Sequence, residues 1–225
     1  MADPRPAPLR TGQLSRERSW SQAAAAVLCM VGLAAVACGG AVFTGRPDPG
    51  DAGPVGRAAT PAEPPADGHG PTVPTEVRGP HGFRARIVPV AAGVDGALNL
   101  PEDARSGAWW ALGAPVGAAR GTVLVAGHVD TRRAGLGVFA ALHALRPGTE
   151  IEVTGANRHT YRYVITARRT YPRQALPRDL FSRAGPHRLA LVTCTGAYDR
   201  TAGGYDRNLV LYAASAPGPG RGAPR

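Results

Sequence analysis

Residues 188–194 read RLALVTC and residues 207–213 read RNLVLYA, and these two runs give the strongest indication of the fold. In the first run apolar and small side chains alternate, with the period of two that is typical of a β-strand. Similar short runs lie at residues 85–90, 122–126, 149–153 and 160–167, separated by Gly, Pro, Asn and Asp. Mostly short strands with few helices predict a β-barrel or a sandwich.

Helices play a small part in the expected fold. Residues 136–145 are the best candidate, because Leu136, Phe139, Ala140, Leu142 and Leu145 fall on one face of a helix. Residues 176–181 are expected to form a second short turn.

The composition divides the chain into five parts. Residues 1–22 are polar and are expected to form a cytoplasmic tail, and the uncharged residues 23–43 are long enough for a transmembrane anchor. Residues 44–83 are rich in Gly and Pro and predict a disordered linker. Residues 84–214 form the expected globular domain, and residues 215–225 a disordered tail.

The apolar segment allows three interpretations. A retained anchor predicts a single-pass protein of the cell membrane with its domain outside. A cleaved signal peptide usually has a shorter apolar run. A lipoprotein signal would end at Cys38, although Ala35 stands where Leu is usual three residues before that cysteine.

The charge is strongly positive. The formal net charge is +10, and all 26 basic residues are Arg. A high-GC genome accounts for this usage, and the alternative is a basic surface that meets an anionic wall polymer or lipid. No nucleic-acid motif accompanies the arginines, so we expect no nucleic-acid partner.

Cys194 is the only cysteine outside the apolar segment. A free cysteine is often a buried, inert side chain. Here it is expected at the end of a strand, at the rim of the domain, where a neighbouring cation would favour the nucleophilic thiolate. The sequence therefore leaves a structural and a catalytic interpretation open.

A histidine and an arginine occupy comparable positions. His128 follows the run TVLVAG, whose small final residues let another strand or a substrate approach, and an imidazole beside a thiol exchanges protons with it. Arg207 opens the last strand, beyond the loop that follows Cys194, where a guanidinium is suited to an oxyanion. Arg200 is the other candidate arginine in the same loop.

These motifs resemble the sortase family over residues 84–213. Leu191-Val192-Thr193-Cys194 is similar to the strand that delivers the sortase nucleophile, and Ala126-Gly127-His128 to the sortase histidine motif. The segment around Arg207 resembles the final strand with the active-site arginine. The motifs occur in family order and look closest to the actinobacterial class called class F.

The resemblance implies an eight-stranded β-barrel and a cysteine transpeptidase. Cys194 would attack a secreted protein at a Leu-Pro-x-Thr-Gly-like sorting signal, and His128 would protonate the leaving amine. Arg207 would stabilise the oxyanion, while Thr193 and Arg200 would place the substrate. An amine of a cell-wall peptide or lipid-linked precursor would then resolve the thioester. We expect no cofactor and no metal, because the acidic residues are scattered.

Three rival interpretations remain. An L,D-transpeptidase would place its histidine and cysteine close together in one motif, whereas here His128 and Cys194 lie far apart in the sequence. A papain-type hydrolase would place its cysteine early and its histidine late. A non-catalytic, membrane-tethered barrel that binds wall polymer or lipid would use the basic surface instead of the thiol.

Overall fold

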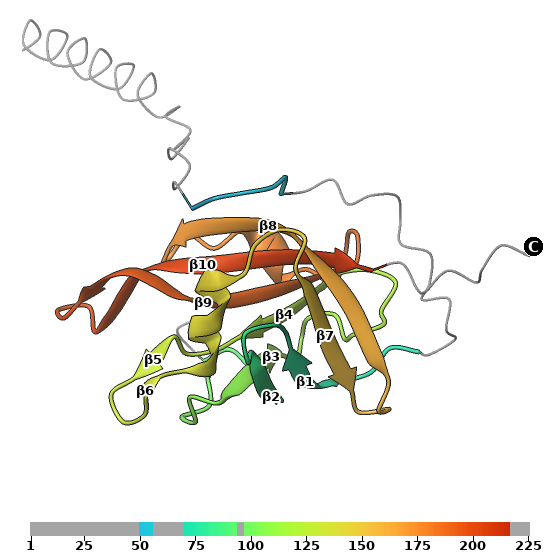
Figure 1. The fold of residues 1–225 in the computed structure, drawn as a ribbon, viewed down its shortest axis with the longest axis horizontal. Coiled ribbons are helices and arrows are strands. Elements are labelled where there is room, and N and C mark those ends of the chain that lie inside the picture. Colours follow the sequence, from blue (N-terminus) through green and yellow to red (C-terminus); the bar gives the residue numbers. More distant parts are fainter. Residues whose placement is uncertain (1–49, 56–69, 94–96, 217–225) are drawn as a thin grey trace, which may run out of the picture. The chain divides into compact units, whose positions relative to one another are not determined.

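The computed structural model describes residues 50–55, 70–93 and 97–216 of the chain. Within them the strands form a closed eight-stranded barrel, which confirms the predicted fold class (Figure 1). Around the barrel the strands follow the order β1 (Pro74–Arg78), β2 (Arg84–Val90), β3 (Ser106–Trp110), β4 (Thr122–Ala126), β9 (Arg188–Asp199), β10 (Gly204–Ser215), β8 (Thr160–Pro172) and β7 (Glu150–Gly155).

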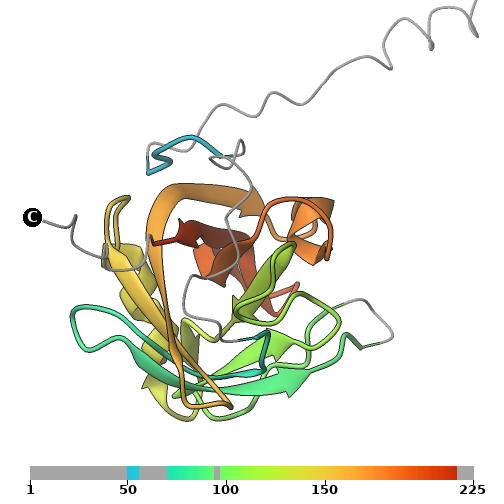
Figure 2. The same ribbon diagram turned by 90° about the vertical axis from the view of Figure 1, so that its right-hand side faces the viewer.

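Two pairs of neighbouring strands are parallel, β2 with β3 and β4 with β9, and the other pairs are antiparallel. A small hairpin, β5 (Asp130–Thr131) and β6 (Gly135–Leu136), follows β4. The β9–β10 hairpin projects from the same end of the barrel as β5 and β6 (Figure 1), and Figure 2 views the barrel from the opposite end.

Buried side chains form two clusters on opposite faces of the sheet. The first contains residues from all eight strands and fills the barrel, so we call its side the inner face. The second lies on what we call the outer face of β4, β9, β10 and β8, where loop residues cover it. Its buried members are Leu124, Ala126, Ala167, Leu180, Ala190, Val192, Val210 and Tyr212. Burying one such leucine contributes about 1.5–3 kcal/mol, so both faces stabilise these strands.

The predicted linker is wrong in both of its described parts. Within residues 44–83, β1 inserts between β2 and β7, and Val77 is fully buried inside the barrel. Upstream, Ala52 pairs with Arg168 of β8 through two backbone hydrogen bonds of 3.1 and 2.8 Å. A barrel strand turns only one face inward, so it needs few apolar residues. With Pro and Gly on either side, such a short apolar pattern was not distinguishable from a linker.

The other boundaries also shift. β3 escaped prediction because four of its five residues are buried, so its burial does not alternate. At the C-terminus β10 includes Ser215, which pairs with Tyr163, so the last strand extends beyond the predicted boundary at residue 214. Residues 1–22, 23–43 and 217–225 lie outside the described residues.

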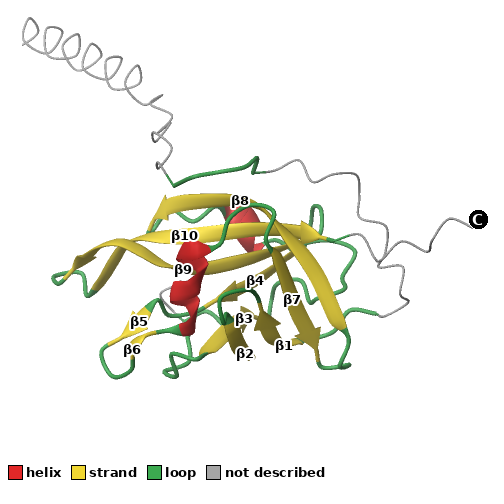
Figure 3. Cartoon of the chain, viewed as in Figure 1, coloured by secondary structure: helices red, strands yellow, loops and turns green. Residues whose placement is uncertain are grey.

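Both predicted helical segments form short 3₁₀ helices, shown in red in Figure 3. They are η1 (Val138–Ala144) and η2 (Arg178–Phe181). Phe139, Leu142 and Leu145 are buried as expected, but Leu136 lies in β6 and is 80% exposed. Among the residues that the structure describes, no helix has the length and apolar character to cross a membrane.

Candidate active site

The parallel pairing of β4 and β9 sets the relative positions of His128 and Cys194. Ala126 pairs with Val192, and the backbone N–H of Gly127 donates to the carbonyl of Val192 at 3.1 Å. His128 lies two positions beyond Ala126, and Cys194 lies two positions beyond Val192. Because neighbouring strands lie about 4.8 Å apart, the two residues come level on adjacent chain segments.

Alternation along the strands places both residues on one face. Ala126 and Val192 belong to the outer cluster, and side chains two positions further along a strand point the same way. His128 and Cys194 therefore continue the outer face beyond its apolar part, and both are half-buried. The fold brings together the two residues that the sequence selected as base and nucleophile.

Cys194 does not end its strand, contrary to expectation. β9 continues to Asp199 and β10 begins at Gly204, so most of the predicted loop between Thr195 and Asp206 is hairpin. The ladder contains one irregularity, where Gly196 and Ala197 lie opposite the single residue Asp206. Gly196 has φ +88°, and the N–H of Ala197 donates to Oδ1 of Asp206 at 2.8 Å. A glycine accepts this bulge conformation without strain, so the strand bends just beyond the thiol.

The surroundings of the thiol favour its protonated form. Burial raises the pKa of Cys194 above its ordinary value, the guanidinium of Arg173 partly offsets this rise, and the carboxylate of Asp130 adds to it. The thiolate is consequently a minor species at neutral pH. A nearby proton acceptor is needed to generate the nucleophile, and His128 lies on the correct face to serve.

Thr193 supports the site from inside. Its side chain is only 2% exposed, and its hydroxyl donates to the carbonyl of Gly127 at 2.9 Å. The side chain thus joins β9 to the segment that carries His128, instead of facing solvent where a substrate would lie. Another unexpected contact is made by His143, whose Nε2 lies 3.3 Å from the carbonyl oxygen of Cys194.

Gly127 itself is required by close packing. A Cβ at this position would lie 2.2 Å from the Phe139 ring, which is fully buried. The residue before the histidine is therefore small because the end of β4 packs directly against η1. The sequence had suggested room for a substrate or strand.

The two predicted arginines lie on the β9–β10 hairpin that carries the thiol. Arg207 pairs with Thr195, whereas Asn208 pairs with Cys194. Directly opposite residues of an antiparallel pair share a face, so Asn208 shares the face of the thiol, and Arg207 belongs to the adjacent row. Arg200 is exposed in the turn between β9 and β10.

Other polar residues near the thiol were missed. The Tyr205 hydroxyl donates to Oδ2 of Asp130 at 2.6 Å, linking the β9–β10 hairpin to β5. This bond raises the pKa of Tyr205 above its ordinary value. Arg173 follows β8 in a stretch without periodicity, so the sequence offered no signal for it. Asp130 could have been predicted as a site residue, since it lies two residues after His128.

No group of three or more His, Cys, Asp or Glu in the described part of the chain is arranged to hold a metal ion.

Comparison with known proteins identifies the fold and the family. The family model described as "Sortase domain" matches residues 83–216. A crystal structure of sortase C1 from Streptococcus agalactiae is similar, with 20% identity, coverage of 64% of this chain and 67% of that chain, and a TM-score of 0.49. The type III crystal structure of the same enzyme is 17% identical, with coverage of 65% of this chain and 68% of that chain and a TM-score of 0.50.

SrtA sortase from Actinomyces oris matches at 21% identity, covering 72% of this chain and 85% of that chain, with a TM-score of 0.48. The type III structure, at a TM-score of 0.50 and 17% identity, shows the fold alone. The family match does not assign a class, so class F stays a prediction. No curated protein matches the chain.

Proposed function

This chain belongs to the sortase family, and from that premise we propose that it is a cysteine transpeptidase that cleaves a Leu-Pro-x-Thr-Gly-like sorting signal. The proposal rests on one observation above all. His128, just beyond the end of β4, and Cys194, within β9, lie level and on the same face, because the register that pairs Ala126 with Val192 continues to them. Sortases act on proteins with sorting signals and on amine acceptors of the cell wall.

The first half of the reaction forms a thioester. The Cys194 thiol gives its proton to His128, and the thiolate adds to the carbonyl carbon of the Thr–Gly bond. The carbonyl π electrons move onto oxygen and produce a tetrahedral oxyanion. When the oxyanion collapses, the C–N bond breaks and the imidazolium gives its proton to the departing amine.

The second half transfers the protein. An amine of a cell-wall peptide or lipid-linked precursor attacks the thioester, and neutral His128 accepts a proton from it. Collapse of the second tetrahedral intermediate breaks the C–S bond, and the imidazolium of His128 returns its proton to the departing sulfur, which restores the thiol. Because the pKa of Cys194 is raised, the departing thiolate takes up this proton readily.

The decisive experiment uses the full-length chain, purified in detergent, with a peptide that contains Leu-Pro-x-Thr-Gly. Mass spectrometry is expected to detect an acyl adduct on Cys194 that hydroxylamine releases and that Cys194→Ala lacks. Failure to acylate, with salt-sensitive binding of wall polymer that survives Cys194→Ala, would favour the rival binding module.

We also propose that residues 23–43 tether the domain outside the membrane. This segment is uncharged and long enough to span ~30 Å of hydrocarbon. Intact mass measurement of the membrane-extracted protein distinguishes the alternatives. A retained anchor leaves residues 1–37 attached, whereas lipidation at Cys38 removes them and adds acyl chains.

A further inference from the structure

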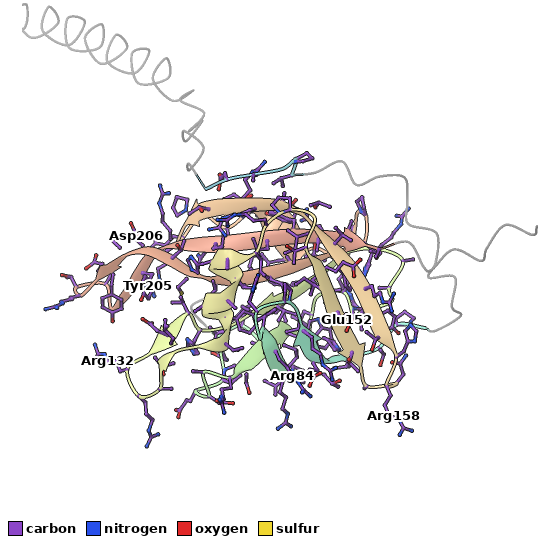
Figure 4. All side chains as sticks on the ribbon, viewed as in Figure 1. Arg84, Arg132, Glu152, Arg158, Tyr205 and Asp206 are labelled. Carbon is purple, nitrogen blue, oxygen red and sulfur yellow. The ribbon has the colours of Figure 1, made fainter. Side chains whose placement is uncertain are left out.

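A second histidine contacts the residue that carries the thiol. Nε2 of His143, in η1, lies 3.3 Å from the carbonyl oxygen of Cys194. A carbonyl oxygen only accepts hydrogen bonds, so Nε2 carries the proton and the imidazole is the donor. Figure 3 shows η1 beside β9, and Figure 4 labels Tyr205 and Asp206 on the hairpin that projects from this end of the barrel.

The hydrogen bond occurs where β9 loses its neighbour. β4 ends at Ala126, and the last bond of its ladder runs from the N–H of Gly127 to the carbonyl of Val192. Every second carbonyl of a strand points to the same side, so the carbonyl of Cys194 is the next one on this side. The chain beyond β4 has by then turned into the β5–β6 hairpin. The imidazole thus supplies the donor that a longer β4 would have supplied.

The imidazole approaches Cys194 from the side of the sheet opposite to the thiol. Phe139 and Leu142 of η1 belong to the inner cluster that fills the barrel, whereas the side chain of Cys194 continues the outer face. His128 shares that outer face. The two histidines therefore differ in what they reach, because His128 lies on the side of the thiol and the imidazole of η1 holds the backbone.

Two arginines hold the backbone from which this imidazole extends. Nη1 of Arg168 donates to the carbonyls of Leu142 and His143 at 3.3 and 3.4 Å. Nη1 of Arg146 donates to the carbonyl of His143 at 3.1 Å. These bonds satisfy carbonyls at the C-terminal end of the helix, which have no partner within it. A donor on such a fixed backbone loses little conformational freedom when it binds its acceptor.

The same helix also contacts the chain just before the base. The ring of Phe139 lies so close to Gly127 that a Cβ there would be 2.2 Å away. η1 therefore touches the residue before His128 through one side chain and touches Cys194 through another, four residues further along the helix. Any displacement of η1 would change the position of the base relative to the nucleophile.

We propose that His143 is a positioning residue for the acyl-transfer reaction. Its hydrogen bond holds the backbone of Cys194 at the distance from His128 that proton exchange requires. This inference rests on the proposed function for the reaction that it serves. Nε2 of His143 stays protonated throughout, and no proton passes through it. The bonds that form and break are those of Cys194, His128 and the substrate.

The test compares three variants of the full-length chain with the parent: His143→Leu, His143→Gln and the control His81→Leu. Leucine removes the donor, whereas glutamine keeps an N–H donor at the end of the side chain. His81 is exposed in the turn between β1 and β2.

Three quantities are measured in each chain. The first is kcat and KM for cleavage of the Leu-Pro-x-Thr-Gly peptide. The second is the pH midpoint for alkylation of Cys194 by iodoacetamide, which needs no substrate. The third is the free energy of unfolding in urea.

His143→Leu is expected to lower kcat about 10²-fold, as a displacement of about 1 Å in an active site does, and to leave KM nearly unchanged. The alkylation midpoint should stay in place, because the imidazole binds the backbone and not the thiol. His143→Gln should recover most of kcat, and His81→Leu should keep all of it.

Three results would overturn the inference. A parental kcat in His143→Leu removes the positioning role. A glutamine variant as slow as the leucine variant shows that the hydrogen bond is not what matters. A moved alkylation midpoint in His143→Leu shows that the imidazole acts on the thiol itself. If His143→Leu does not fold, His143→Gln decides, since near-parental kcat supports the role and a loss of about 10²-fold refutes it.

The proposed function can fail separately. If the parent chain does not cleave the peptide, the assigned reaction is wrong, and the free energy of unfolding then decides on the contact. A loss of stability in His143→Leu that His143→Gln restores supports the hydrogen bond to Cys194. Equal stability of both variants and the parent refutes it.

Discussion

The hydroxyl of Thr193 donates a hydrogen bond of 2.9 Å to the carbonyl oxygen of Gly127, across the parallel strands that carry the nucleophile and the base. Each partner is the residue directly before a reactive one, Cys194 and His128 respectively. The bond is buried, so water does not replace it when it is lost. A hydrogen bond on the inner face of the sheet thus fixes the relative positions of His128 and Cys194 on the outer face.

Thr193→Val tests this support. Valine keeps the shape but leaves the carbonyl of Gly127 without its side-chain donor, so the free energy of unfolding is expected to fall by about 1–3 kcal/mol. Acylation should slow more than the alkylation of Cys194, because the position of His128 changes while the thiol stays. Urea unfolding and peptide acylation measure the two effects.

Thr193→Ser is the matched control for that experiment. It retains the hydroxyl and should keep most of the acylation rate. A serine variant as slow as the valine variant would show that the methyl group, and not the hydrogen bond, matters.

Asp130→Asn is expected to lower the pH midpoint for alkylation of Cys194 by iodoacetamide, which follows the thiolate fraction. The carboxylate raises the pKa of the thiol, so removing its charge favours the thiolate. Asparagine keeps an oxygen for the Tyr205 hydroxyl, which now donates to Asp130 at 2.6 Å.

The control for Asp130 is Tyr205→Phe, which removes the hydroxyl and leaves the carboxylate charged. The pH profile of iodoacetamide alkylation serves for both variants. An upward shift in Asp130→Asn would contradict the assigned electrostatics.

His187 predicts acid sensitivity of the barrel. It is buried, its Nε2 lies 2.9 Å from the Tyr163 hydroxyl, and burial lowers its pKa to about 4. The unfolded chain, with an ordinary pKa of about 6.5, binds a proton first as the pH falls. The stabilisation is therefore full above pH 6.5 and is lost between pH 6.5 and 4, by roughly 2–4 kcal/mol.

Urea unfolding at pH 7 and pH 4.5 checks this window in the parent chain, in His187→Gln and in His81→Gln, whose imidazole is exposed. The glutamine at position 187 cannot take up the proton, so that variant should lose less stability on acidification. Equal losses in all three chains would assign the acid sensitivity to carboxylates such as Glu76, whose pKa is also lowered.

A truncated chain of residues 47–225 is expected to fold, whereas one of residues 83–225 is not expected to form the closed barrel. The shorter chain lacks β1, so it loses the burial of Val77, which contributes about 1.5–3 kcal/mol. It also exposes the edges of β2 and β7 to solvent and to other chains. Thermal unfolding followed by circular dichroism compares them, and equal transition midpoints would contradict a structural role for β1.

The sequence patterns indicated a mostly β fold, which the family resemblance narrowed to a closed barrel. They also located the strand at residues 122–126 and selected Cys194 and His128 as the reactive residues. Each depends on local patterns, namely alternation, an apolar run, and polar residues following it. The strand at residues 188–194 was also found, but its continuation to Asp199 was not, because Gly196 and exposed polar residues interrupt the apolar pattern there.

The packed fold was needed to show which residue of β10 lies opposite the thiol. Spacing along the chain selected Arg207, yet moving by one residue along a strand turns a side chain to the other face of the sheet. Register with β9 places Asn208 opposite Cys194 and Arg207 opposite Thr195. The strand β1 could not be predicted for a similar reason. Its one apolar face is recognisable as a buried face only when β2 and β7 lie on either side of it.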